Sequence, residues 1–185
     1  MTPFWVLQTE KAPASAVLTE DALILENRYI RRVIDRKTGL TVSLTDGDGT
    51  EAIARPIREG AVSVDGTGYI LENPGTIRIR EGSLTEKKFE YIPKPYNTHP
   101  YPYPAPGKAA EITYLRDALE IKLVYEIFDD MPVMRKSLYV TNHGDHTVTI
   151  DTAETEALCL NDTGKLQLYL ETDYTGNNGY GFQWN

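Results

Sequence analysis

Apolar and polar residues alternate with a period of two along most of this 185-residue chain. In the stretch "LEIKLVYEIF" (119–128), every second residue from Leu119 to Ile127 is apolar or aromatic, whereas Glu120 and Lys122 lie on the opposite side of an extended backbone. No stretch of the sequence has a convincing helical spacing. Alternation of this kind is typical of antiparallel sheets that have one buried face and one face in water.

Turn-forming residues separate the alternating stretches at short intervals. Asp65-Gly66, between two apolar runs, predicts a two-residue hairpin turn. We expect about eleven or twelve strands, near residues 22–26, 29–35, 40–45, 61–64, 68–71, 76–80, 84–91, 110–115, 119–128, 133–141, 148–160 and 166–171. Many short strands with turns between them are typical of a sandwich, so we predict an all-β fold: a large antiparallel β-sandwich of about 11–14 strands with little helix.

Charge excludes two classes of partner. The chain has 27 acidic and 19 basic residues, a formal net charge of −8, which repels a phosphate backbone and gives no attraction to anionic lipid. We therefore expect no nucleic acid and no membrane as partners. The first residues do not form a convincing signal peptide. The compartment stays open between the cytoplasm and, if a leader was removed, a secreted or periplasmic location.

The sequence contains no motif that identifies a catalytic centre. The Gly-x-Ser-x-Gly turn, the phosphate-binding glycine loop, the His-Glu-x-x-His helix and paired Cys-x-x-Cys are all missing. The stretch "DGDGTE" (46–51) begins like a calcium-binding loop but lacks the later glycine and glutamate, so we interpret it as a polar turn. His143 and His146 lie in a predicted turn and are expected in solvent. We predict no catalytic residue, no metal site and no cofactor.

Glu154 and Glu156 are two carboxylates at a spacing that fits one face of a strand, roughly 6.6 Å apart along it. Two carboxylates hydrolyse a glycoside only when they flank a bound sugar in a cleft. Neighbours on one strand seldom do so. We interpret this pair as part of a solvated strand face.

Five prolines and three tyrosines gather in "KPYNTHPYPYPAPGK" (94–108). Proline cannot donate to a strand ladder, so this segment is predicted to be a long connection and not a central strand. Aromatic faces stack on sugars, which suggests that Tyr96, His99, Tyr101 and Tyr103 bind a sugar or contact a neighbouring domain. Two alternatives stay open: the rings cap the edge of the sandwich, or the segment is a proline-rich ligand for an SH3-type groove.

Two stretches resemble a known family. "LENRYIRRVIDRKTGLTVSLTD" (25–46) and "LEIKLVYEIFDDMPVMRKSLYVTNHGDHTVTID" (119–151) resemble the N-terminal β-supersandwich domain of α-galactosidase-type glycoside hydrolases of the family-36 kind, which has a galactose-mutarotase-like fold. In the second stretch the family has an aromatic-Asp-Gly-x-Pro turn. Phe128, Asp129 and Pro132 match that turn, and Asp130 stands in place of its glycine.

The resemblance implies a division of the chain and a role. Residues 21–172 would form the supersandwich, 1–20 a lead-in, and 173–185 a linker or the start of a further domain. In the enzymes that it resembles, a following (β/α)₈ barrel supplies the catalytic carboxylates. This implies a non-catalytic domain whose partners are carbohydrate and a downstream barrel of the same polypeptide. The alternatives are a stand-alone carbohydrate-binding module and a mutarotase-like sugar epimerase, and a homo-oligomer stays open.

Overall fold

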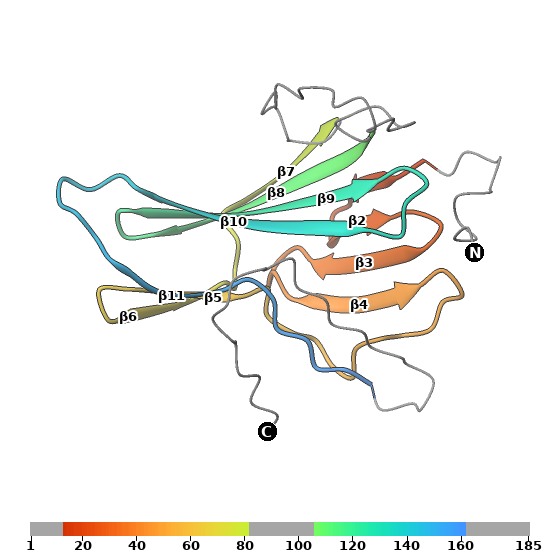
Figure 1. Ribbon diagram of the computed structural model, residues 1–185, viewed down its shortest axis with the longest axis horizontal. Helices are drawn as coiled ribbons and strands as arrows, with labels where there is room; N and C mark the ends of the chain where they lie inside the picture. The colour runs from red at the N-terminus through yellow and green to blue at the C-terminus, as the bar shows by residue number, and fades with distance from the viewer. Residues whose placement is uncertain (1–12, 82–105, 162–185) are drawn as a thin grey trace, which may run out of the picture.

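The computed structural model describes residues 13–81 and 106–161, and this part of the chain is all-β, without helix (Figure 1). Its strands are β1 (Ser15–Leu18), β2 (Ala22–Glu26), β3 (Ile30–Asp35), β4 (Thr41–Asp46), β5 (Ala61–Val64), β6 (Thr67–Ile70), β7 (Thr76–Glu81), β8 (Gly107–Arg116), β9 (Leu119–Phe128), β10 (Met134–Asn142) and β11 (Ile150–Glu154). The all-β prediction is confirmed at this level.

The strands form three antiparallel sheets, with the orders β1-β2-β3-β4, β10-β9-β8-β7 and β11-β5-β6. Within the second sheet the β8–β9 ladder is the longest, and it pairs Gly107 with Phe128 at one end and Arg116 with Leu119 at the other. Figure 1 shows this sheet lying across the other two. The third sheet is assembled from distant segments, because β11 pairs with β5 across about half of the chain.

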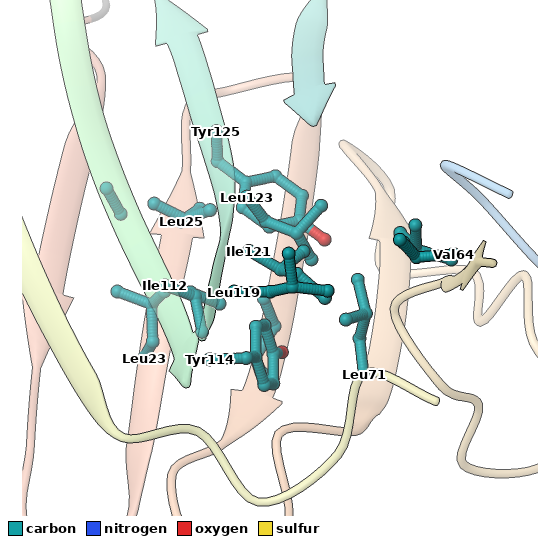
Figure 2. Packing of buried hydrophobic residues seen from close by; sticks show 13 residues of the cluster. Leu23, Leu25, Val64, Leu71, Ile112, Tyr114, Leu119, Ile121, Leu123 and Tyr125 are labelled. Carbon is teal, nitrogen blue, oxygen red and sulfur yellow. The ribbon is translucent and has the colours of Figure 1, made fainter. Parts of the chain in front are cut away.

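The hydrophobic core lies where the β10-β9-β8-β7 sheet packs against the other two sheets (Figure 2). Alternate residues of β9 point into it, and Ile121, Leu123 and Tyr125 are fully buried. Leu23 and Leu25 of β2 meet them from the first sheet, and the third sheet adds the β5 valines. At roughly 25 cal/mol per Å² of buried apolar surface, this burial is the main force that holds the sheets together.

The sequence predicted most strands within one or two residues of their observed bounds, although β8 begins three residues before the start predicted for it at 110. Two predictions differ more. First, β1 was missed, because "SAVL" is short and does not alternate. Second, the single long strand expected at 148–160 is wrong, since β11 covers only Ile150–Glu154. The strands expected near 84–91 and 166–171 lie outside the described residues, and the domain division stays a prediction.

Turns at left-handed backbone positions connect the strands. Asp65 and Gly66 have φ of 47° and 77°, and two successive positive φ values are those of a type I′ hairpin, so the predicted β5–β6 turn is confirmed. Within "DGDGTE", the Asp46 carboxylate accepts hydrogen bonds from the backbone N–H groups of Asp48 (3.0 Å) and Thr50 (2.8 Å). That stretch is therefore a polar turn, as predicted.

Gly60 provides a test of the junction between β5 and β11. Its φ is +152°, and an added Cβ would collide with the carbonyl oxygen of Glu154 on β11. Gly60→Ala should therefore lower the free energy of unfolding by about 2–4 kcal/mol, through overpacking and backbone strain. Urea denaturation of the variant measures this. Gly68→Ala is the matched control, because nothing lies within 4 Å of its Cβ position. Equal stability of the two variants would contradict the close approach at Gly60.

Candidate functional site

The predicted sugar-contacting residues Tyr96, His99, Tyr101 and Tyr103 lie outside the described residues, so their role stays a prediction. Two other polar sites occur in the described part of the chain. One is a buried cluster of charges between the sheets. The other is a groove on the outer face of the β10-β9-β8-β7 sheet.

The buried charge cluster consists of Arg32, Thr41, Glu59, Lys136 and Glu156. Arg32 lies on β3 and Lys136 on β10, so the cations come from opposite sheets. Glu59 comes just before β5 and Glu156 just after β11. The alternation that places Ile34 in the core also turns Arg32 inward, and only 5% of its side chain is exposed. The cluster therefore joins segments of all three sheets.

Arg32 is the centre of the cluster. Its Nε donates to the Thr41 hydroxyl at 2.7 Å, and its Nη2 donates to Glu59 Oε2 at 2.9 Å. Its two terminal nitrogens also donate to both carboxylate oxygens of Glu156, at 2.8 and 3.0 Å. The Thr41 hydroxyl in turn donates to Glu59. Bidentate pairing of this kind fixes direction as well as distance, so Arg32 holds Glu156 in one orientation.

Lys136 completes the charge balance. Its Nζ donates to the Glu59 carboxylate at 2.9 Å and to the Glu59 carbonyl at 2.6 Å, and Glu156 lies 3.4 Å away. The ring of Tyr125 lies 5.1 Å from the Arg32 guanidinium carbon and 5.2 Å from the Lys136 nitrogen. Both cations therefore gain an aromatic face in addition to the carboxylates. Two positive and two negative charges cancel within the cluster.

Burial and pairing shift the ionisation of these groups. Burial lowers the pKa of Lys136, although Glu59 and Glu156 act in the opposite direction. Burial alone would raise the pKa of Glu156, but hydrogen bonds and charge from Arg32 and Lys136 outweigh it and lower that pKa. Burial would lower the pKa of Arg32, but its bonds to Glu156 and Glu59 raise it. Glu156 is thus held as a carboxylate.

The structure corrects the interpretation of Glu154 and Glu156 as a solvated strand face. That interpretation is wrong for Glu156, which lies beyond the end of β11 and enters the buried charge cluster with one-third of its side chain exposed. Glu154 accepts two hydrogen bonds of 3.0 Å from Arg58. No sequence signal identified these partners, because the arginine of each pair is about a hundred residues away in the chain.

The outer groove has a volume of about 190 Å³ and crosses three strands. The residues that line the groove alternate along the strands with core residues, so the groove lies on the face of the sheet opposite the core. The lining consists of Gly75, Thr76, Arg78 and Arg80 on or just before β7; Glu111, Thr113 and Leu115 on β8; and Glu120 and Lys122 on β9. Cross-strand pairing aligns Arg78 with Glu111, and Thr76 with Thr113 and Lys122. The groove thus presents hydroxyls and charges in ordered rows.

The two histidines of the 142–146 turn are exposed, as predicted, with 59% and 70% of the His143 and His146 side chains in solvent. Within 13–81 and 106–161, no three His, Cys, Asp or Glu side chains come together in a way that would hold a metal ion. A search of these residues for a helix long and apolar enough to cross a membrane found none. Comparison of the chain with protein-family models, with curated proteins and with solved structures found no match.

Removal of one buried charge tests the cluster. Glu59→Gln leaves Arg32 and Lys136 short of a charge in a buried site, and should cost about 3–5 kcal/mol of stability. Glu154→Gln breaks the half-exposed pair with Arg58 and should cost only about 0–1 kcal/mol. Chemical denaturation at neutral pH compares the two. Similar losses in both variants would show that the buried charge cluster does not join the sheets.

Acid provides a second test. Because the folded-state pKa of Glu156 is lowered, its contribution to stability is complete above the ordinary glutamate pKa and is lost as pH falls through the folded value. Glu156→Gln should therefore be less stable than the wild type near pH 7, and the difference should shrink below about pH 4. Urea midpoints between pH 7 and pH 3 measure this. Glu20→Gln, at an exposed position, is the control, and a Glu156 effect independent of pH would contradict the assignment.

Proposed function

We propose that this chain is a non-catalytic β-sandwich domain, of the supersandwich kind, that supports a carbohydrate-active enzyme of the α-galactosidase-like class. The observation that carries the proposal is the backbone at Asp130, where φ is +54°. The family that the sequence resembles has glycine at this place in its turn. Glycine adopts a positive φ without steric cost. The turn therefore keeps the backbone conformation that suits the family's glycine, although Asp130 has replaced that glycine.

The other residues that carry the resemblance have structural tasks, which supports the same proposal. Asn27, in the first stretch, donates from Nδ2 to the carbonyls of Phe128 (2.9 Å) and Met131 (2.7 Å), so the two similar stretches meet at the Asp130 turn. Asn142 closes its own turn through Gly144 N–H at 2.9 Å. A pattern whose residues fix turns is one that follows a fold and not a reaction.

The described carboxylates favour a supporting role over a catalytic one. Glu156 and Glu59 are engaged with Arg32 and Lys136, and Glu154 with Arg58. A glycosidase acid needs a raised pKa and a cleft shared with its partner carboxylate, whereas Glu156 has a lowered pKa. On this proposal the hydrolytic carboxylates belong to a downstream (β/α)₈ barrel of the same polypeptide, and carbohydrate is the common ligand.

A stand-alone carbohydrate-binding module is the second candidate, because the outer groove offers a polar face that crosses three strands. A mutarotase-like epimerase would need a histidine acid and a carboxylate base in one cleft. His143 and His146 are instead exposed in a turn, so that role has the least support.

The gene and two enzyme assays test the proposal. The reading frame should continue beyond residue 185 into a barrel with two spaced carboxylates, and the whole enzyme should release nitrophenol from a nitrophenyl α-galactoside. Changing either barrel carboxylate to its amide should abolish release, whereas Glu154→Gln in this domain should leave it unchanged. Steady release by purified 1–185 alone would contradict the proposal, and a stop codon after residue 185 would leave the stand-alone module in its place.

A further inference from the structure

The outer groove differs in charge from the rest of the molecule. Arg80 pairs with Glu111 at 3.2 Å, and Lys122 pairs with Glu120 at 3.4 Å. Arg78, in the same groove, has no ion-pair partner among the described residues. The groove therefore has one positive charge in excess on a chain whose net charge is −8. This excess favours a ligand that carries one negative charge.

The groove also contains a buried carboxylate and a pair of threonines. Glu111 is a buried carboxylate, with 8% of its side chain exposed, and it holds Arg80 against the sheet. Thr76 and Thr113 form a cross-strand pair one step along from the Arg78–Glu111 pair. Both threonines line the groove, and a threonine hydroxyl can both donate and accept hydrogen bonds. Arginine, with its planar fork of donors, is the side chain best suited to a carboxylate.

An exposed aromatic ring lies on the same outer face, on the strand next to the groove lining. Tyr139 of β10 pairs with Lys122 of β9, so both side chains lie on the same outer face. Its side chain is on the surface, and the residue is 55% exposed. From β7, with Arg78, to β10, with Tyr139, the face spans three strand spacings, or about 14 Å. Tyr139 also lies two residues along the strands from the row of Arg78, so the backbone positions of the two residues are at least that far apart. A ring so far from the cation suits an extended ligand with apolar C–H faces and not a small inorganic anion.

We infer that the outer groove binds an oligosaccharide that carries a carboxylate, with Arg78 on the carboxylate and Tyr139 stacked on a sugar ring farther along the same ligand. The volume of about 190 Å³ is below the roughly 300–1,000 Å³ of pockets for drug-sized ligands, so the groove takes one acidic ring while the rest of the ligand lies along the sheet. This inference rests on the proposed association with carbohydrate and adds the class of sugar.

Calorimetric titration of residues 1–185 with a matched pair of ligands tests the inference. A trisaccharide of two neutral hexoses and one terminal uronic acid carries a single carboxylate, and its methyl ester has the same rings without the charge. The acid should bind at least about tenfold more tightly than the ester, which is the contribution expected of a hydrogen-bonded charge pair. Inorganic phosphate serves as the ligand that has charge without a sugar, and it should bind more weakly than the acid.

Three variants separate the two contacts. Arg78→Gln should weaken binding of the acid about tenfold or more and leave the ester unchanged, which removes the difference between the ligands. Tyr139→Ala should weaken acid and ester by a similar factor. Arg55→Gln, at an exposed arginine outside the groove lining, should change neither. All three positions are exposed, so the melting temperature should stay that of the wild type.

Several outcomes would overturn the inference: equal binding of acid and ester, binding of phosphate as tight as that of the acid, an Arg78→Gln variant with full affinity, or no binding of either saccharide. These outcomes are distinguishable from failure of the proposed function. Hydrolysis by a downstream barrel would still establish the domain as part of a glycosidase even if the groove bound no acid.

Discussion

Arg32 is the point on which the arrangement of the three sheets depends. Apolar packing brings the sheets together but does not fix their relative positions, since the hydrophobic effect has no direction. The guanidinium supplies that direction, because it holds Thr41, Glu59 and Glu156 in fixed geometry while Lys136 approaches from the opposite sheet. Each carboxylate follows or precedes a strand of the β11-β5-β6 sheet, so the cluster sets where that sheet lies against the other two.

The two faces of the β10-β9-β8-β7 sheet have different tasks because strand geometry separates them. Along β8, Ile112 and Tyr114 enter the core, whereas Glu111 and Thr113 line the outer groove. The same division occurs on β9 between Ile121 and Lys122. Core packing makes the sheet rigid, and rigidity keeps the outer rows of side chains in register. The sheet thus presents a fixed polar surface without needing a preformed deep pocket.

Much of the fold was accessible from sequence, because period-two alternation and turn residues act locally. The bounds of β2, β5 and β9 were predicted to the residue, and Asp65-Gly66 identified its hairpin. The sites were not accessible in this way. The Arg32–Glu156 contact joins residues 124 positions apart, and the outer groove arises from the register between β7 and β8. Such contacts depend on tertiary pairing, which no local pattern in a single sequence encodes. The strand β1 was missed for a local reason, because four residues are too few to show a clear alternation.

Heat changes the balance of forces in this molecule in an uneven way. The hydration free energy of charged groups becomes less favourable as temperature rises, so the cost of removing them from water falls, whereas apolar stabilisation per unit area levels off. The side chains of Arg32, Glu59 and Lys136 are largely out of water in the folded chain. The fraction of the stability that these charges contribute therefore grows on warming. The junction of the three sheets becomes stronger relative to the apolar core, whose stabilisation per unit area no longer increases.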